Sequence, residues 1–231
     1  ATASTLLEIG NVYRLLSDFE SADSVYEKGL EILLGTDPLY HDLVFAKAHI
    51  LLFQSDYQNA LARFVQVREA RISSHGRDHM KTGVTSRSLG LVQFLVNHID
   101  EAMVHLNEFV RVYELQDENA NETIDYAMSV LLLGDMHSIK GNRDQAENLL
   151  AVALEVCEDN GFAKSSMDFV DIVDSRNNKT LPPGNNGSKD GECGRGGLFS
   201  RLAGRSIDET ELLTDANERK VLESMVIVDD Y

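Results

Sequence analysis

A frame of small and bulky residues recurs four times over about the first two thirds of this sequence. An alanine stands at intervals of 38, 42 and 44 residues (Ala22, Ala60, Ala102 and Ala146). Twelve positions before each alanine stands a small residue (Gly10, Ala48, Gly90 and Gly134), and four positions after it stands a large apolar one (Tyr26, Phe64, Leu106 and Leu150). Small residues at fixed intervals are needed where helices approach closely, so the frame predicts one helical hairpin repeated four times.

Each copy of the frame is expected to hold two amphipathic helices joined by a tight turn. In residues 130–154, apolar and small residues follow helical spacing on both sides of Lys140-Gly141-Asn142, which marks the turn. Further turns are expected at Ser55-Asp56 and Asn97-His98-Ile99. In the first copy, Asp18 is expected to cap a second helix that runs to about Leu34 and ends at Gly35-Thr36-Asp37-Pro38.

The small residue at the eighth position and the alanine at the twentieth resemble the tetratricopeptide repeat. A spacing near 42 residues is similar to the kinesin light chain type of this family, whose repeats carry longer second helices and longer links. The loop Gly76-Arg77-Asp78-His79 resembles the Gly-x-Asp-His-Pro loop of that type, with Met80 in place of the proline. The asparagines usual in its first helices are replaced here by Leu7-Glu8 and Arg87-Ser88.

The resemblance implies an all-α fold, an α-solenoid of about four repeats followed by a largely disordered C-terminal tail. The repeats are expected at about 3–36, 41–76, 82–116 and 122–159, as eight main helices stacked in a right-handed superhelix. Residues 161–173 are a candidate capping segment, because a solenoid end must cover its apolar face. Residues 174–231 are expected to form a flexible tail with a weak helix at 207–223, since Asn, Gly, Ser and Pro are frequent in its first part.

The charge of the chain is negative and unevenly distributed. Residues 1–160 hold 25 acidic and 12 basic residues, a net charge of −13, and residues 161–231 hold 13 acidic and nine basic residues, a net of −4. Nucleic-acid binding requires a concentrated positive surface, so no nucleic-acid partner is expected. Six of the twelve bases lie in residues 63–87; Arg63, Arg68 and Arg71 among them are expected on a solvated outer helix face.

The two cysteines, Cys157 and Cys193, form no metal or disulfide framework, which favours a reducing compartment. No run of 18 apolar residues occurs, so no membrane span is expected. The prediction is a cytoplasmic location, or an organelle if a targeting segment has been removed before Ala1.

No catalytic, cofactor or metal site is predicted, and the chain is not expected to be an enzyme. The compact cluster of His75, Asp78 and His79 lacks the further ligands that zinc requires; in the family loop, His79 would pack and Asp78 would cap the next helix. The expected function is a protein interaction module, a scaffold or adaptor. The alternative is a regulatory or structural part of an enzyme or larger assembly whose activity lies outside this chain.

The resemblance implies that the concave surface, formed by the first helix of each repeat, binds a peptide or partner segment. The family's groove positions carry over to Leu7, Asn11, Arg14, Phe45, His49, Phe53, Arg87, Leu91, Phe94, Leu131, Asp135 and Ile139. Leu91 and Leu131 equally suit packing between repeats. Two arginines and three phenylalanines with a single acid favour an acidic, aromatic-containing peptide, the kind that kinesin light chains take.

Residues 225–231 combine apolar, acidic and aromatic side chains, which is the character expected of such a peptide. A flexible linker could bring this segment to the groove of the same chain, where a high local concentration would let it compete with partners. An intramolecular contact of the tail with the groove is therefore a hypothesis to be tested.

Overall fold

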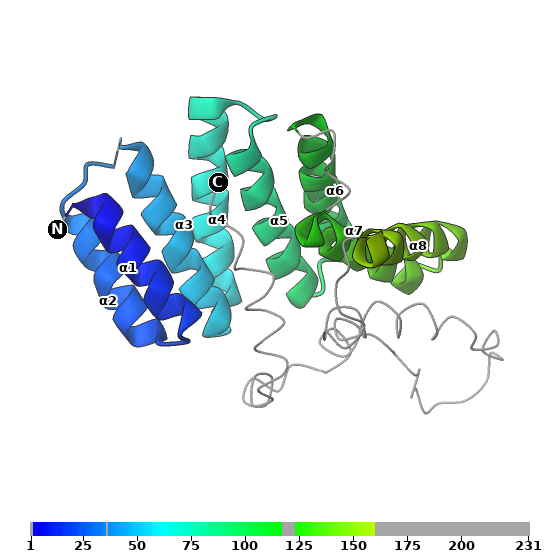
Figure 1. The fold of residues 1–231 in the computed structure, drawn as a ribbon, viewed down its shortest axis with the longest axis horizontal. Helices are drawn as coiled ribbons and strands as arrows, with labels where there is room; N and C mark the ends of the chain where they lie inside the picture. The colour runs from blue at the N-terminus through cyan, green and yellow to red at the C-terminus, as the bar shows by residue number, and fades with distance from the viewer. Residues whose placement is uncertain (1, 36, 117–122, 160–231) are drawn as a thin grey trace. The chain divides into compact units, whose positions relative to one another are not determined.

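The computed structural model describes residues 2–35, 37–116 and 123–159, and these residues form eight α-helices (Figure 1). The helices are α1 (Ala3–Leu15), α2 (Phe19–Glu31), α3 (Pro38–Phe53), α4 (Tyr57–His75), α5 (Met80–Leu95), α6 (Ile99–Gln116), α7 (Ile124–Ile139) and α8 (Arg143–Asp159). No strand occurs in those three ranges, so the all-α fold is confirmed. The candidate capping segment 161–173 and the predicted tail 174–231, with its helix at 207–223, lie outside the described residues.

The described helices fall into two compact units, α1 to α6 and α7 with α8. In the first unit the helices pair in chain order, α1 with α2, α3 with α4 and α5 with α6, and follow one another from blue to green in Figure 1. Contacts of α2 with α3, α1 with α3, and α4 with α5 join these hairpins. The second unit holds the fourth hairpin, and the right-handed superhelix of all four stays a prediction.

The recurring frame marks the place where the two helices of each hairpin cross. Its four alanines are at most 1% exposed. A carbon added at Gly90 would lie 2.7 Å from Leu106 Cγ, one added at Gly134 would lie 3.1 Å from Leu150 Cγ, and Gly10 faces the Tyr26 ring in the same way. The bulky residue of the frame therefore packs directly onto the glycine twelve positions before the alanine.

Each hairpin turn contains one residue in the left-handed conformation. These residues are Ser17, Ser55, Asn97 and Gly141, with φ of 58°, 62°, 64° and 81°. In the first two hairpins the next residue is an aspartate that caps the following helix: Asp18 Oδ1 accepts a hydrogen bond from the Ser21 N–H at 3.1 Å, and Asp56 Oδ1 accepts one from the Asn59 N–H at 3.3 Å. The cap at Asp18 and the turns at Ser55, Asn97 and Gly141 are confirmed.

The link between the first two hairpins differs from the prediction. Helix α2 ends at Glu31 rather than near Leu34, whose side chain is 78% exposed. Pro38 does not merely end a helix but opens α3, because a proline at the first helical position lacks only an N–H that would have no partner there. Asp37 caps α3 by accepting a hydrogen bond from the Leu39 N–H at 2.8 Å.

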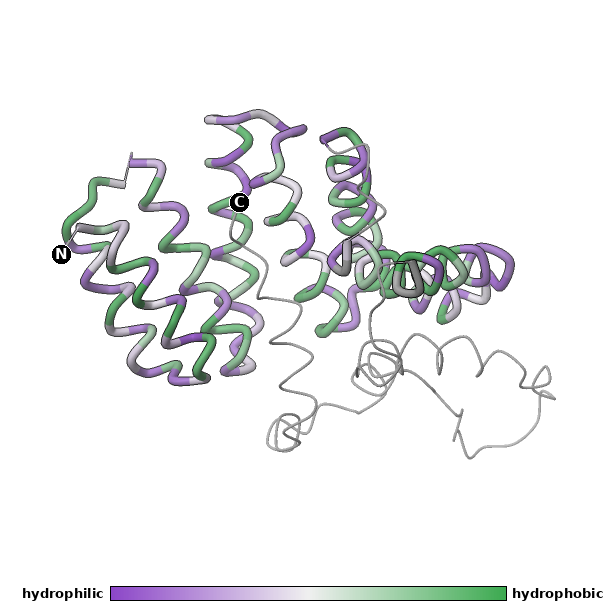
Figure 2. Tube along the Cα trace, in the orientation of Figure 1, coloured by the Kyte–Doolittle hydropathy of each residue, from purple (hydrophilic) through white to green (hydrophobic). Residues whose placement is uncertain are grey.

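The first helices of the second and third hairpins are buried on more faces than the helices that follow them. Helix α3 has nine buried residues and α4 has four, while α5 has eleven and α6 has five. Figure 2 shows hydrophobic and hydrophilic stretches alternating along the helices, as expected of amphipathic segments. Because α3 contacts α1, α2 and α4, its polar side chains Asp42 and Lys47 are half-buried and its His49 is buried.

Candidate functional site

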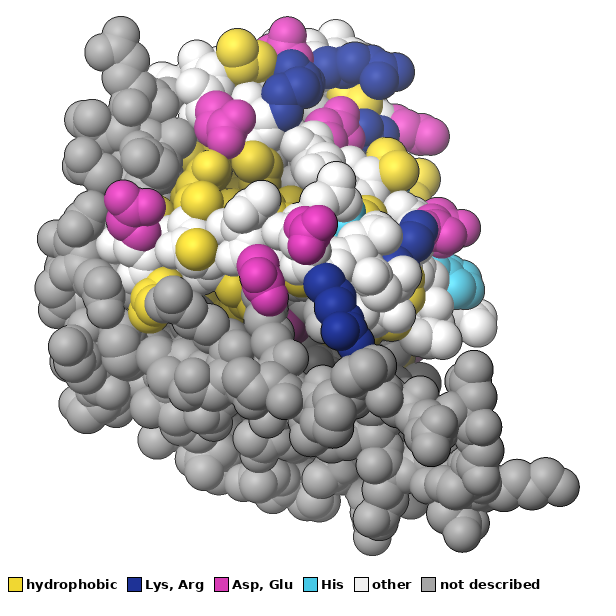
Figure 3. Space-filling model, turned by 90° about the vertical axis from the view of Figure 1, so that its right-hand side faces the viewer, with side chains coloured by type: hydrophobic (Ala, Val, Ile, Leu, Met, Phe, Trp, Pro, Cys, Tyr) yellow, Lys and Arg dark blue, Asp and Glu magenta, His cyan; other side chains and the backbone are white. Residues whose placement is uncertain are grey.

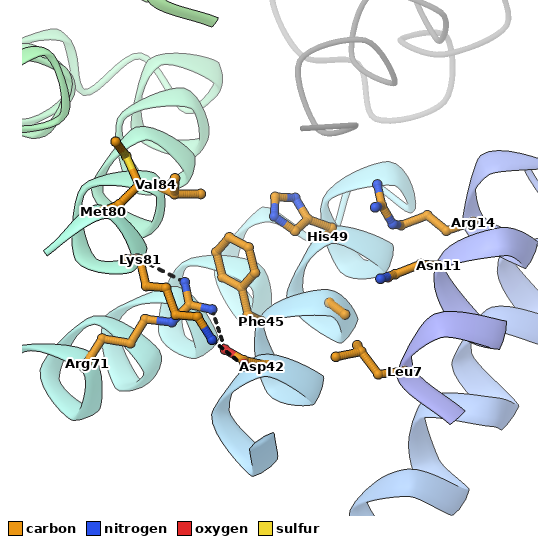
Figure 4. A pocket seen from close by; sticks show the side chains of 11 residues that line it. Leu7, Asn11, Arg14, Asp42, Phe45, His49, Arg71, Met80, Lys81 and Val84 are labelled. Carbon is orange, nitrogen blue, oxygen red and sulfur yellow. Dashed lines mark hydrogen bonds and ion pairs between the residues drawn. The ribbon is translucent and has the colours of Figure 1, made fainter. Parts of the chain in front are cut away.

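A pocket of about 100 Å³ lies in the first unit, where side chains of α1, α3, α4 and α5 converge (Figure 4). Its lining residues are Leu7, Asn11, Arg14, Asp42, Phe45, Ala46, His49, Arg71, Met80, Lys81 and Val84. Three of them are cationic (Arg14, Arg71 and Lys81) and one is anionic (Asp42), so the lining carries three positive charges minus one, a balance of +2. The net charge of the lining is therefore opposite in sign to the net charge of the whole chain.

An aromatic cluster supports the pocket from α3 and α4. The rings of Phe45 and His49 meet edge to face with centroids 4.6 Å apart, and both rings contact Phe64, at 5.5 and 4.9 Å. Phe64 is the bulky residue of the frame in the second hairpin and is fully buried. The hairpin crossing therefore fixes the position of Phe45 and His49, because all three rings pack as one group.

A polar cluster joins α3, α4 and α5 at one side of the pocket. Asp42 accepts hydrogen bonds from Arg71 Nη2 at 2.8 Å and from Lys81 Nζ at 2.7 Å (Figure 4). Arg71 Nη1 also donates to Thr85 Oγ1 at 2.7 Å. The Arg71 guanidinium also lies 4.3 Å from the centre of the Phe45 ring. Burial by itself raises the pKa of Asp42, but the hydrogen bonds and charges of Lys81 and Arg71 outweigh it and hold this pKa below its ordinary value.

A second polar cluster joins α4, α5 and α6. Arg68 Nη2 donates to Glu108 Oε1 at 2.7 Å, Arg68 Nε donates to Ser86 Oγ at 3.0 Å, and Ser86 Oγ donates to Glu108 Oε2 at 3.0 Å. Burial raises the pKa of Glu108, while hydrogen bonds from Arg68 and Ser86 lower it further than burial raises it. The two clusters tie the second hairpin to the third.

The prediction that Arg63, Arg68 and Arg71 share a solvated outer face is wrong for two of them. Arg71 is 6% exposed and Arg68 is half-buried; Arg63 is exposed and donates to Gln66. The buried side chains of α4 are Ala60, Phe64, Val67 and Arg71, which follow helical spacing. Arg71 thus continues the apolar stripe of Phe64, and that continuation was the sequence signal for its burial.

The loop between the second and third hairpins also differs from the expectation. His79, not Asp78, caps α5: its Nδ1 accepts a hydrogen bond from the Lys81 N–H at 3.1 Å. Asp78 instead pairs with Arg111 at 2.7 Å. The rings of His75 and His79 lie 4.6 Å apart, and the described residues contain no group of three or more His, Cys, Asp or Glu side chains placed to hold a metal ion.

His49 lies at the centre of a positive environment. Burial first, and then the charges of Arg14, Arg87 and Arg71, hold the pKa of His49 well below its ordinary value, so its imidazole is neutral at neutral pH. Figure 3 shows acidic side chains spread singly, rather than gathered in a patch, over the face that it displays. The cations around His49 are therefore concentrated, while the acids visible on that face are dispersed.

Five of the predicted groove residues line the pocket, namely Leu7, Asn11, Arg14, Phe45 and His49. Asn11 is also a structural residue, since its Oδ1 accepts a hydrogen bond from the Tyr26 hydroxyl at 2.8 Å. Arg87 is not in the lining, although its charge acts on His49. Sequence reasoning missed Asp42, Arg71, Met80, Lys81 and Val84, which line the same pocket.

The other predicted residues of the first unit pack in its interior. Phe53 stacks on Phe19 with ring centroids 4.9 Å apart and is 6% exposed. Phe94 is fully buried and Leu91 is 5% exposed, and neither lines this pocket. Of the two alternatives for Leu91, packing between repeats therefore describes its environment better than a position in the groove.

The last three predicted residues lie on α7, in the second unit. Leu131 and Asp135 are buried, with 1% and 6% exposure, and Ile139 is 49% exposed. A single groove containing all twelve predicted residues therefore stays a prediction, and the pocket of the first unit is the site that the described residues form.

Two models of the tetratricopeptide repeat match the chain, at residues 3–32 and at residues 43–115. These ranges contain the crossings at Gly10 and Gly90 described above. Residues 3–32 and 43–115 are tetratricopeptide repeats. Proteins of this kind generally mediate protein–protein interaction, and the repeat fold is typically a non-catalytic interaction module. No curated protein matches the chain in sequence.

Solved structures with similar repeats share the fold at low sequence identity. BtubC (BKLC) from P. vanneervenii is 12% identical with a TM-score of 0.61, and the match covers 80% of this repeat protein and 84% of that chain. A putative kinesin light chain of Podosopora anserina with nearly identical TPR-like repeats is 14% identical with a TM-score of 0.60, covering 75% and 82%. The resemblance to kinesin light chains predicted from the repeat spacing is thus confirmed for the fold.

A third similar structure, aspartyl phosphate phosphatase F from Bacillus subtilis, is 12% identical with a TM-score of 0.63. The match covers 75% of this repeat protein but 44% of that chain.

None of the described helices is long and apolar enough to cross a membrane.

Proposed function

We propose that this chain is a scaffold or adaptor whose pocket among α1, α3, α4 and α5 binds an acidic, aromatic-containing segment of a partner protein. The observation that carries the proposal is the charge of the pocket. Its lining has a balance of +2 in a region, residues 1–160, with a net charge of −13. Asp42 pairs with both Arg71 and Lys81, and a partner carboxylate suits the positive charge of the lining that this single acid does not balance.

The rest of the lining suits an aromatic or long apolar side chain. Leu7, Phe45, Met80 and Val84 contribute apolar surface beside the charged groups. At about 30 Å³ per water molecule in the liquid, a cavity of about 100 Å³ has room for about three water molecules, so it accepts the end of one side chain. The pocket therefore matches one buried anchor side chain with a carboxylate next to it, the arrangement in which a few residues supply most of the binding energy.

Binding to labelled peptides tests this function directly. Fluorescence anisotropy with the full chain should give micromolar to submillimolar affinity for decapeptides that combine Asp or Glu with Tyr or Phe, and much weaker binding when Lys replaces the acids. Arg14→Gln should weaken binding, because Arg14 lines the pocket, whereas the matched control Arg63→Gln should not, because Arg63 is exposed on α4. Equal binding by both variants would count against this site.

A second candidate is that the repeats are the regulatory or structural part of an enzyme or larger assembly. The similarity to a structure described as a phosphatase, of which the match covers 44%, supports it, since there the fold occurs within a longer protein named for an activity. Purification of native complexes with the tagged chain separates the candidates: stable co-purification of one catalytic subunit in fixed stoichiometry supports the second.

We place the protein in the cytoplasm. Cys157 and Cys193 have no further cysteine with which to build a disulfide framework, which suits a reducing compartment. Imaging of the tagged protein in cells checks this location.

A further inference from the structure

We infer that the joint between the second and third hairpins opens on mild acidification, because protonation of His79 removes the side-chain cap of helix α5. The joint consists of the loop at residues 76–79 and the first turn of α5, which begins at Met80. Such an opening is independent of the proposed peptide binding, since it concerns how two hairpins of the same chain hold together.

His79 satisfies three backbone N–H groups at the start of α5. Its Nδ1 accepts a hydrogen bond from the Lys81 N–H at 3.1 Å, and its backbone oxygen accepts from the N–H groups of Thr82 and Gly83 at 2.9 and 3.1 Å. The first four N–H groups of a helix have no partner within the helix, so the Lys81 N–H depends on the imidazole. A ring nitrogen can accept this hydrogen bond only while it carries no proton.

The caps of α1, α2, α3, α4 and α7 use side chains that do not change their charge in the same pH range. These side chains are Thr2, Asp18, Asp37, Asp56 and Thr123. A threonine hydroxyl does not titrate, and an aspartate is ordinarily protonated only near about pH 4, whereas an imidazole takes up its proton near about pH 6.5. Among these caps, the cap of α5 is therefore the first to be lost on acidification.

Basic groups surround the imidazole of His79. The His75 ring, at the end of α4, lies 4.6 Å from it between ring centres. Burial first, and then electrostatic repulsion from His75, Lys81 and Arg71, lower the pKa of His79 below its ordinary value, so this ring is neutral at neutral pH. Protonation would also put a positive charge at the N-terminus of α5, where the helix dipole disfavours it.

The carboxylates at this joint are engaged with other bases. Asp78 pairs with Arg111 of α6 at 2.7 Å, and Asp42 of α3 accepts a hydrogen bond from Lys81 Nζ at 2.7 Å (Figure 4). A proton on His79 is therefore accommodated by turning the ring away, which releases the Lys81 N–H.

The stability that this cap provides is present at neutral pH and is lost on acidification. Because the pKa of His79 is lower in the folded chain, the contribution is complete above the unfolded-state pKa of about 6.5 and is lost as pH falls through the folded-state pKa. The carboxylates of Asp42 and Glu108 keep their charge in this window, since their pKa values are also lowered. Lys81 lies in the first turn of α5 and ties the third hairpin to Asp42 of the second, so this tie loosens with the cap.

The tautomer and titration of His79 are the first test, made on the full chain labelled with ¹⁵N. Long-range ¹H–¹⁵N NMR at pH 7.5 should show the ring proton of His79 on Nε2 and none on Nδ1, with a titration midpoint below that of a histidine in an unfolded chain. The spectrum of His79→Asn assigns the signal. A proton on Nδ1 at pH 7.5, or a midpoint at or above the unfolded-state value, overturns the inference.

Amide exchange at Lys81 is the second test, expressed as a protection factor so that the pH dependence of the exchange chemistry is removed. Protection of the Lys81 N–H should fall about fivefold between pH 7.5 and pH 5.0, the size expected for the loss of one helix cap. The Leu39 N–H is the internal reference, because it occupies the same position in α3 and its cap is the carboxylate of Asp37, at 2.8 Å. Its protection should not change.

Two variants of His79 isolate the imidazole. His79→Asn keeps a capping oxygen that does not titrate, so protection of the Lys81 N–H should be equal at the two pH values. His79→Ala lacks the cap, so this protection should be low at both. The matched control His98→Asn replaces an exposed histidine directly before α6 and should respond to pH like the parent.

The response of His79→Asn decides between a local and a general effect of acid. A loss of Lys81 protection at pH 5.0 in this variant as large as in the parent overturns the inference. Equal loss of far-UV helicity at pH 5.0 in the parent and in this variant overturns it as well. In that case acid would act on the repeats through other buried groups, such as His49 and His105, whose pKa values are also lowered by burial.

Discussion

The close crossing at Gly90 makes a sharp prediction for Gly90→Ala. Gly90 lies in α5 where this helix meets α6, and a methyl group there would be placed 2.7 Å from Leu106 Cγ and 3.1 Å from the backbone oxygen of Ala102. Neither neighbour can yield easily, since Leu106 is 1% exposed and the Ala102 oxygen belongs to the backbone of α6. The substitution should therefore strain the hairpin.

Two opposing free-energy changes, helix propensity and overpacking, set the size of the loss in stability. Alanine favours a helix interior over glycine by about 1 kcal/mol, which acts in favour of the variant. Overpacking of a well-packed core costs about 1–3 kcal/mol, and contact with backbone puts this site at the upper end of that range. The net result should be a loss of about 2 kcal/mol in the free energy of unfolding, or about 4–8 °C in Tm for a chain of this size.

Thermal and urea unfolding followed by far-UV circular dichroism measure this loss, with two other glycines as references. Gly134→Ala should cost less, because its methyl group would lie 3.1 Å from Leu150 Cγ and 3.5 Å from the Ala146 backbone oxygen, both farther than the corresponding distances at Gly90. Gly35→Ala should be neutral or slightly stabilising, since nothing lies within 4 Å of the added carbon. A Gly90→Ala variant as stable as the parent, or more stable, would refute the packing argument.

Three further predictions concern the register, the polar cluster at the pocket and the tail. Ala102→Phe should destabilise by about 1–3 kcal/mol or more, since Ala102 is fully buried at the same crossing; an unchanged Tm would contradict the register. The lowered pKa of Asp42 means that its contribution to stability is present above the unfolded-state pKa and is lost as pH falls through the folded-state pKa. Asp42→Asn should therefore be less stable than the parent at pH 7 by about 1–3 kcal/mol, with a difference that shrinks on acidification, as pH-dependent urea unfolding can measure. Limited proteolysis should first cut in residues 177–197, whose composition is typical of a linker, and leave a helical fragment; cleavage within the repeats before the tail would contradict this boundary.

The hairpins could be predicted from the sequence because their interactions are local. A small residue, an alanine twelve positions later and a bulky residue four further on lie within one helix, turn and helix, so helical periodicity alone brings them together. The same holds for Asp18 and for the left-handed turn residues, whose effects reach only a few positions. The start of α3 was missed because Pro38 suits a helix start as well as a helix end.

Only about half of the residues that line the pocket could be predicted from the sequence. Leu7, Arg14 and His49 were found because equivalent positions of each hairpin share a face, and the repeat frame numbers those positions. Asp42, Arg71 and Lys81 could not be found in this way, since Arg71 and Lys81 lie 29 and 39 residues after Asp42. Asp42 meets Arg71 across the second hairpin, and Lys81 joins them only through the packing of the third hairpin on the second.

The sequence by itself determined the helices, their turns and the close crossing within each hairpin, because helical spacing and residue size decide these at short range. Only the tertiary structure decided which polar side chains are enclosed between helices and which partners they meet there. Arg71 looks like a solvated residue in the sequence, yet the last turns of α4 pack against α5, where Asp42, Thr85 and the Phe45 ring surround its guanidinium. Burial of that charge is tolerated because two neighbouring helices, α3 and α5, supply its partners at once, and a requirement that joins α3, α4 and α5 cannot be read from any one of them.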